Sequence, residues 1–276
     1  MLYGELFRKR VNSKKVIPMI GVYDVYSSIL ASKYYSSIFC SGYGFSASYY
    51  GLPDEGYIAW SDMIGYIHRI RSILPNIDII VDVDEGYGDP NILKNTIKQL
   101  YNVGASGFIL EDQRRPKKCG HLPGKELIPL SEYILRLEAA LSVKKDMYVI
   151  ARTDSNEIED ILKRVECFSK YDIDAILVEG VSDLSIFSKI KAAAGNKKLV
   201  INLIEGGETN FENFEYFYDK NISIVNYSTP CLFSAHAAID KTLSKMKQNI
   251  SKKPESGITL IESSLVIKNA INNSFK

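Results

Sequence analysis

Three carboxylates, Asp82, Asp84 and Glu111, lie at or just beyond the ends of apolar runs with the composition of buried strands. Oxygen ligands of this kind suit Mg2+ or Mn2+, which proteins hold largely through water. Three such groups in one place would repel one another unless a cation lay among them. The sequence therefore predicts a divalent metal site, with surface aspartates in the turn at residues 84–88 as the alternative.

A short irregular loop follows Glu111 and carries a thiol and an imidazole among several cations. Its charged and reactive residues are Arg114, Arg115, Lys117, Lys118, Cys119 and His121. Proline or glycine at positions 116, 120, 123 and 124 excludes regular structure. A thiol flanked by cations is expected to have a lowered pKa, so Cys119 is a candidate proton donor or nucleophile. A mobile loop of this composition suits a site that closes over an anionic substrate.

Other functions for this loop have less support in the sequence. Cys119 and His121 lack the four-ligand spacing of a zinc site. The chain has no Gly-x-Ser-x-Gly motif, and no acid is obviously placed as the third member of a thiol protease triad. The cations of residues 114–118 could form a solvated loop, and the lack of interleaved aromatic residues argues against nucleic acid binding.

The composition is that of an ordinary globular protein. The 276 residues are 46% hydrophobic and 24% charged, with a net charge of +1. No apolar run is long enough to cross a bilayer, and the first residues do not form a signal-peptide core. The four cysteines are far apart and are expected to be free thiols in a reducing compartment. We therefore expect a cytoplasmic protein that binds neither nucleic acid nor a membrane.

Eight apolar runs alternate with segments of helical pattern. The runs are 16–21, 37–42, 77–82, 108–111, 147–151, 175–178, 199–203 and 222–226. The helical segments are 25–33, 61–72, 90–103, 131–142, 157–170, 182–194, a short one from 211, and 232–248. The runs are continuously apolar, as buried parallel strands are, which predicts one (β/α)8 TIM barrel over residues 1–250. A doubly wound sheet is the alternative. Residues 251–276 are expected to form a C-terminal tail or an extra helix.

Polar residues follow six of the eight predicted strands, at the end where barrels of this type carry their active sites. They are Ser41 and Gly42, Asp82 and Asp84, Glu111, Arg152, Glu179 and Asn202. Any one of them could be a cap or turn residue, but together they predict a single site. Arg152 could clamp a substrate carboxylate through two hydrogen bonds, or form a salt bridge across the barrel mouth.

Taken in order, these motifs resemble the isocitrate lyase/phosphoenolpyruvate mutase superfamily. The matching segments are 41–42, 51–54, 82–88, 111–113, 116–121, 124–125, 151–154 and 202–207. The resemblance covers roughly residues 5–250 and is strongest to the short branch of 2-methylisocitrate lyase-like and carboxyphosphonoenolpyruvate mutase-like enzymes. It implies a Mg2+-dependent barrel enzyme for small 2-hydroxy or 2-oxo acids. It also implies homotetramers, dimers of dimers that exchange the last barrel helix.

The resemblance also implies roles for individual residues. Asp84 would contact the metal directly, while Asp82 and Glu111 would hold its waters. The substrate-binding residues would be Ser41, Gly42, Tyr43, Asp54, Arg152, Glu179 and Asn202. The catalytic residues would be Cys119, His121, Lys117, Arg152 and Glu111, with the Cys119 thiol as the acid.

Two features depart from the superfamily pattern. Tyr43 stands where the lyases commonly have glycine, and residues 227–230 differ from the usual Tyr-Pro start. The predicted function is a Mg2+-dependent carbon–carbon lyase. Its substrate would be a small 2-hydroxy di- or tricarboxylic acid, resembling 2-methylisocitrate or dimethylmalate, and its products a 2-oxo acid and a carboxylate. The alternatives are a phosphonate enzyme, an oxaloacetate hydrolase or decarboxylase, or a binding protein that has lost catalysis.

Overall fold

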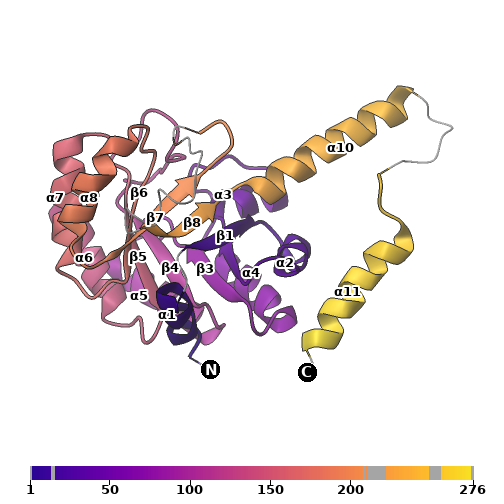
Figure 1. The fold of residues 1–276 in the computed structure, drawn as a ribbon, viewed down its shortest axis with the longest axis horizontal. Helices are drawn as coiled ribbons and strands as arrows, with labels where there is room; N and C mark the ends of the chain where they lie inside the picture. The colour runs from indigo at the N-terminus through magenta and orange to yellow at the C-terminus, as the bar shows by residue number, and fades with distance from the viewer. Residues whose placement is uncertain (1, 14–15, 208, 210–221, 249–255, 275–276) are drawn as a thin grey trace.

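Eight parallel strands close into a barrel in the computed structural model, which describes residues 2–13, 16–207, 209, 222–248 and 256–274 (Figure 1). The strands are β1 (Ile17–Val22), β2 (Ser37–Cys40), β3 (Asp78–Asp82), β4 (Gly107–Glu111), β5 (Tyr148–Thr153), β6 (Ala175–Val178), β7 (Lys198–Leu203) and β8 (Ile222–Tyr227). Each strand pairs with the next in the chain, and β8 pairs with β1. The predicted (β/α)8 barrel is confirmed.

Helices surround the barrel and connect its strands. They are α1 (Tyr3–Ser13), α2 (Val25–Ser32), α3 (Gly42–Phe45), α4 (Trp60–Ile73), α5 (Pro90–Asn102), α6 (Leu130–Leu141), α7 (Ile158–Ser169), α8 (Phe187–Ala194), α10 (Pro230–Gln248) and α11 (Leu260–Ser274). Local capping fixes several starts: Asp89 accepts hydrogen bonds from the backbone of Asn91 and Ile92, with Pro90 in the first turn. The helix predicted from residue 211 lies outside the described residues.

Some predicted helix starts were wrong. The helix expected from Ser61 begins at Trp60, because the Asp62 carboxylate accepts a hydrogen bond from Ala59 N at 2.8 Å. The helix expected from residue 182 begins with a 3-10 turn (η2, Leu184–Ile186), which Asp183 stabilises by accepting from Ser185 N at 2.9 Å.

The segment that directly follows β2, which no predicted helix covered, is helical. Helix α3 continues into a π-helical turn (η1, Ser46–Tyr50). Phe45 holds this segment against α4, because its ring stacks on that of Tyr66 at 5.0 Å and on that of Tyr49, within the segment, at 5.2 Å.

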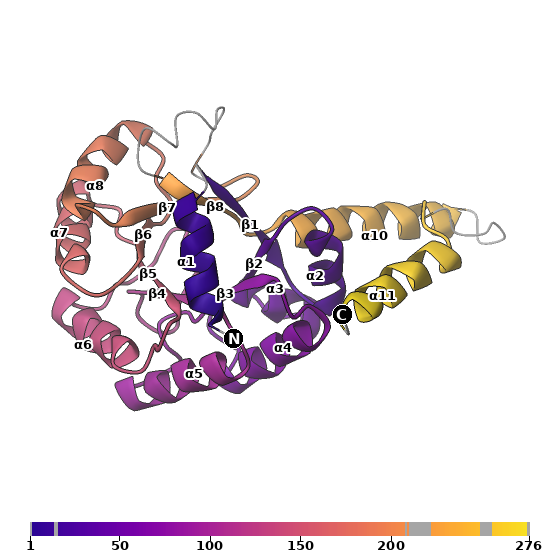
Figure 2. The ribbon, with the colours of Figure 1, turned by 60° about the horizontal axis from the view of Figure 1, so that its bottom comes forward.

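Helix α1 closes one end of the barrel and leaves the other end for chemistry. Phe7 and Val11 of α1 belong to the same buried cluster as the inward-facing residues of the strands, including Ile109 and Ile150. The Phe7 ring meets that of Tyr148 edge-on at 4.9 Å. Figure 2 shows α1 lying across the barrel, at the end opposite the carboxyl ends of the strands.

The last two helices differ in how they meet the barrel. Figures 1 and 2 show α10 projecting away from the strands and α11 lying beside α2 and α4. Helix α10 buries none of its side chains, and α11 buries only Ala270. Among the described helices, none is long and apolar enough to cross a membrane.

Candidate active site

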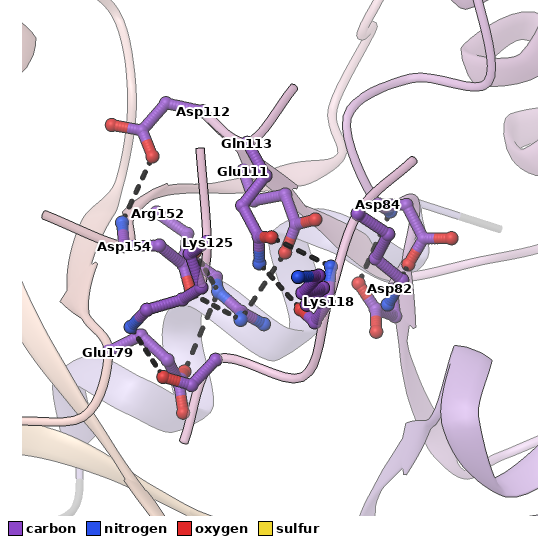
Figure 3. Close-up of polar contacts among 12 residues, drawn as sticks. Asp82, Asp84, Glu111, Asp112, Gln113, Lys118, Lys125, Arg152, Asp154 and Glu179 are labelled. Atoms are coloured by element: carbon purple, nitrogen blue, oxygen red, sulfur yellow. Dashed lines mark hydrogen bonds and ion pairs between the residues drawn. The ribbon is translucent and has the colours of Figure 1, made fainter. Parts of the chain in front are cut away.

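Several of the predicted site residues, among them Asp82, Glu111 and Arg152, meet at the carboxyl ends of the strands (Figure 3). Charged side chains that proteins normally leave in water are buried there: Asp84 is 0% exposed, Glu179 2% and Arg152 8%. Removing such groups from water is costly unless they are paired. The ion pairs and hydrogen bonds among these buried charged groups therefore determine how the site is arranged.

Asp82 ends β3, and Asp84 follows it in a sharp turn. The Asp84 backbone is left-handed, with φ of 46°, and its N–H donates to Asp82 Oδ1 at 3.2 Å. A non-glycine residue in this conformation is uncommon and often marks a functional position. The backbone of Gly42 lies directly above, because an added Cβ would be 3.2 Å from Asp84 Oδ1 and 3.4 Å from Asp82 Oδ2.

Lys117 lies against this turn rather than beside the loop thiol. Its Nζ is 2.7 Å from Asp84 Oδ1 and 2.7 Å from Asp54 Oδ1. Burial alone would lower the pKa of Lys117, but Asp54 and Asp84 outweigh it and raise the pKa well above its usual value. Lys117 is therefore a fixed cation among carboxylates that were expected to need a bound metal ion for charge balance.

Arg152 forms the second charged centre. Its Nε and Nη2 donate to the two oxygens of Asp154 at 2.8 and 2.9 Å, and Nη2 is 3.3 Å from Glu111 Oε2. The two-pronged contact expected with a substrate is therefore made with Asp154, and the alternative salt bridge across the barrel mouth is present. The described contacts of the guanidinium are made by Nε and Nη2.

Asp154 is a site residue that the sequence reasoning did not select. Its backbone N–H donates to Asp112 Oδ1 at 3.0 Å, and Arg164 holds Asp112 Oδ2 at 3.0 Å. Its position two residues after Arg152 could have identified it, because residues two apart at a strand end share a face.

Glu179 organises the far side of the site. His121 Nε2 lies 2.6 Å from Glu179 Oε1, and Asn202 Nδ2 donates to the same oxygen at 2.7 Å. Burial raises the pKa of Glu179, but Arg152 and His121 outweigh it and bring the pKa down to about 2. Glu179 is therefore ionised at neutral pH.

Two further polar residues were missed, Asn226 and Ser228 beyond Asn202. Ser228 Oγ donates to Asn202 Oδ1 at 2.6 Å, and Asn226 Nδ2 donates to the same oxygen at 3.1 Å. These bonds turn the amide group of Asn202 toward Glu179. The unusual sequence at residues 227–230 was the signal that could have identified Ser228.

The loop after β4 is closed over the site. Gly120 has no room for a side chain, because an added Cβ would lie 2.5 Å from Arg152 Nη2 and 2.6 Å from Asp154 Oδ1. The Gln113 side chain holds the loop base, accepting from Lys118 N at 2.9 Å and donating to Lys118 O at 2.8 Å. Lys125 Nζ donates to Gly120 O at 2.5 Å.

The close approach of Gly120 gives a direct test of loop closure. Gly120→Ala should lower kcat/KM by about ten- to hundredfold, because overpacking of this kind typically costs about 1–3 kcal/mol. The control is Gly65→Ala, where the nearest atoms to an added Cβ are the Arg69 guanidinium at 3.7–4.0 Å. Unchanged kinetics in Gly120→Ala would show that the enzyme does not react with this loop closed.

Cys119 is half-buried, and its pKa is raised rather than lowered. Burial is the main cause, and the backbone of His121 offsets it only in part. The expected lowering was wrong because Lys117 faces the aspartates and His121 faces Glu179. A thiol of this kind keeps its proton at neutral pH, which suits a donor better than a nucleophile.

Tyr43 and Ser41 line the β2 side of the site. Ser41 Oγ accepts from Gly44 N at 3.0 Å and so caps α3. Burial is the main cause of a raised pKa at Tyr43, and the charges of Asp54 and Cys119 add to it. Substrate contacts from Ser41, Gly42 and Tyr43 remain a prediction.

The aspartate side of the site fits a divalent metal. Asp84 Oδ2 and Glu111 Oε1 are buried and accept no hydrogen bond from the described residues. Within the described ranges, no three His, Cys, Asp or Glu side chains are arranged as direct ligands. The donor set suits Mg2+, which commonly takes one or two carboxylates and several waters. Asp84 would hold it, with Asp82 and Glu111 nearby.

Comparison with known proteins agrees with this architecture. The barrel and its relatives define an enzyme of the isocitrate lyase/phosphoenolpyruvate mutase superfamily. A family model described as phosphoenolpyruvate phosphomutase matches residues 7–247, and the chain belongs to that family.

Individual relatives carry several different activities in their names. The chain is 31% identical over 257 residues to the chloroplastic carboxyvinyl-carboxyphosphonate phosphorylmutase of Arabidopsis thaliana, covering 90% of this chain and 75% of the relative. It is 29% identical over 253 residues to 2-methylisocitrate lyase of Bacillus subtilis, covering 90% and 82%. A solved structure of oxaloacetate acetylhydrolase with 3,3-difluorooxalacetate superposes with a TM-score of 0.92 at 28% identity, covering 99% and 96%.

Proposed function

We propose that the protein is a Mg2+-dependent carbon–carbon lyase. Its substrate is a small 2-hydroxy di- or tricarboxylic acid of the 2-methylisocitrate or dimethylmalate kind. The observation that carries this proposal is Cys119, a thiol whose pKa is raised by burial, on a loop closed over a paired charge cluster. Cleavage of a carbon–carbon bond leaves a carbanion that must be protonated, and such a thiol can supply the proton.

The reaction removes the proton of the 2-hydroxyl group and breaks the bond between C2 and C3. The hydroxyl oxygen becomes the carbonyl of a 2-oxo acid, and the bonding electrons pass to C3. The Cys119 thiol protonates C3, and the second product is a carboxylate. The proton taken from the hydroxyl returns to the thiolate through solvent, which restores the enzyme.

Glu111 is the proposed acceptor of the hydroxyl proton. Burial raises its pKa well above the usual value, against the opposing charges of Arg152 and Lys117. A raised pKa makes the ionised Glu111 carboxylate a stronger base, so it can accept this proton. Arg152, Glu179 and Asn202 would orient the oxygens of the substrate. Bound Mg2+ would stabilise negative charge developing on those oxygens.

Oxaloacetate cleavage to oxalate and acetate is the second candidate. The structural similarity to oxaloacetate acetylhydrolase favours it. Tyr43 would also favour a small substrate if its ring lies beside the substrate carboxylate, as the superfamily resemblance implies. A phosphonate rearrangement has the support of the phosphorylmutase relative. That chemistry needs no carbon protonation and would leave Cys119 without a role.

A substrate panel tests the proposal. Purified enzyme with Mg2+ is offered 2-methylisocitrate, 2,3-dimethylmalate, oxaloacetate and phosphonopyruvate, and the products are separated and identified. The proposal expects a 2-oxo acid from one of the first two at the highest kcat/KM. Turnover of phosphonopyruvate alone would refute it.

Tyr43 should set the size of the substrate. Tyr43→Gly should raise the ratio of kcat/KM for the bulkier acids to that for oxaloacetate by about tenfold or more, since one or two carbon groups in a pocket are worth that much. Tyr57→Gly is the control, because Tyr57 is 60% exposed. An unchanged ratio would mean that the Tyr43 ring does not limit the pocket.

We further propose that two chains exchange α10 within a homotetramer. Helix α10 buries no side chain of its own and exposes Ile239 and Leu243, while an apolar groove of about 860 Å3 lies open beside it. Pro18, Leu30 and Tyr34 are among the residues that line this groove. The α10 helix of a second copy would cover this groove. Light scattering should give the mass of four 31.0 kDa chains, and a monomer at micromolar concentration would refute the exchange.

A further inference from the structure

We propose that Arg115 is a positioning residue that holds the catalytic loop, residues 114–125, in its closed state. It does so by joining that loop to the segments that follow β2 and β3. The effect of Arg115 on catalysis rests on the function proposed above, whereas its effect on loop closure does not. Arg115 is not part of the charge cluster under the loop.

Three acceptors from two other segments converge on the Arg115 guanidinium. Nη1 donates to Glu85 Oε1 at 2.8 Å, in the turn after β3. Nη2 donates to Gly56 O at 2.5 Å and to Ile58 O at 3.3 Å, in the segment before α4. A Cβ at position 56 would lie 3.2–3.4 Å from the guanidinium, so glycine allows this close approach. The planar fork of arginine suits contacts in two directions at once.

Among the Arg115 contacts, the ion pair with the buried Glu85 carboxylate is expected to contribute most to loop closure. The Glu85 residue is 1% exposed, and Arg136 Nη1 donates to its backbone oxygen at 2.9 Å, which holds the turn that carries the side chain. Among the described residues, Arg115 is the cation within ion-pair distance of its carboxylate. Opening the loop would leave this buried carboxylate without its partner, which is strongly unfavourable. The closed state is therefore favoured before any substrate binds.

The position of Arg115 in the chain connects it to the chemistry. Lys117 and Cys119 follow it by two and four residues, and Lys117 reaches Asp54 and Asp84 at 2.7 Å. Fixing Arg115 against the β2 and β3 segments therefore sets where these two side chains can reach. Glu85 directly follows Asp84, so the same contact ties the loop to the aspartate turn.

Arg114 provides a matched contrast within the same loop. Its side chain is 53% exposed, and its Nε is 3.8 Å from an oxygen of Glu126, which is 77% exposed. Ion pairs of this kind contribute little to stability. Two adjacent arginines thus differ in burial and partners, and only Arg115 is expected to affect loop closure.

The alkylation rate of Cys119 by iodoacetamide measures loop opening without any substrate. Full-length Arg115→Met, Arg115→Lys, Glu85→Gln and Arg114→Met are labelled, and each cysteine is followed by peptide mass spectrometry. Cys167 in α7 is the internal reference, because it is also partly exposed but lies on another element. The melting temperature is recorded for each variant.

Arg115→Met should raise the ratio of Cys119 to Cys167 alkylation by about tenfold or more, since hydrogen bonds to charged groups are lost. Arg115→Lys and Glu85→Gln should raise it less, and Arg114→Met should not change it. If Arg115→Met does not fold, the Arg115→Lys and Glu85→Gln ratios decide the outcome. A ratio within twofold of wild type in the folded variants, or equal acceleration at both cysteines, would overturn the proposal. Neither result depends on which acid the enzyme cleaves.

Discussion

Replacing Cys119 by serine is expected to lower kcat by about a hundred- to ten-thousandfold, which is the range of general acid catalysis. Serine keeps the shape of the side chain, but an alcohol is a far weaker acid than a thiol, whose pKa is about 8.5 in solution. Burial raises the pKa of Cys119 further, so the thiol holds a proton at neutral pH that it can donate. The measurement is kcat and KM for wild type and Cys119→Ser on the best substrate of the panel.

The comparison separates two roles for Cys119. A proton donor lowers kcat while Mg2+ binding survives. A residue that only packs the closed loop raises KM and leaves kcat nearly intact. Cys167→Ser is the matched control, because it makes the same change in a partly exposed cysteine of α7. A kcat for Cys119→Ser within about threefold of wild type would rule out the donor role, which is proposed to supply at least a hundredfold.

Removal of the divalent metal is expected to abolish activity, with Mg2+ or Mn2+ restoring it. Asp84→Ala should lower kcat/KM by about a hundredfold or more, because charge stabilisation by the metal supplies several kcal/mol. It should also weaken Mg2+ binding, measured by calorimetry, more than Asp82→Ala does. The reason is that Asp84 Oδ2 is buried without a hydrogen-bond donor among the described residues.

The Lys117 contact affects which properties should change when the metal is removed. Its ammonium group already pairs with Asp84, so a protein without metal need not suffer repulsion among its carboxylates. The melting temperature should therefore change little on adding EDTA, while turnover is lost. Full turnover in metal-free buffer, verified by elemental analysis, would contradict the metal requirement.

The fold could be predicted because it depends on short-range patterns. Continuous apolar runs such as residues 77–82 and 147–151 mark strands buried on both faces, and eight of them alternating with helices leave few architectures. The same alternation places the residue after each run at one end of the barrel. For that reason Asp82, Glu111, Arg152 and Glu179 could be assigned to one site from sequence alone.

The contacts within the site could not be predicted in the same way. Loop conformation decides which cation faces which acid, and it turns Lys117 toward Asp54 and Asp84 and away from Cys119. The direction of the Cys119 pKa shift then follows from burial, which a linear spacing does not show. Asp154, Asn226 and Ser228 act through neighbours on other strands, so their part in the site appears only once the barrel is closed.

Cleavage of the best 2-hydroxy acid in D2O, followed by NMR of both products, tests the central claim most directly. A carbon–carbon lyase with a solvent-exchanged thiol donor should yield a 2-oxo acid and a carboxylate with one deuterium at the carbon that departed. The deuterium should enter at a single stereochemical position, because Cys119 approaches from one face. If phosphonopyruvate rearranges to phosphoenolpyruvate while no acid of the panel is cleaved, the enzyme is a mutase and the lyase proposal is contradicted.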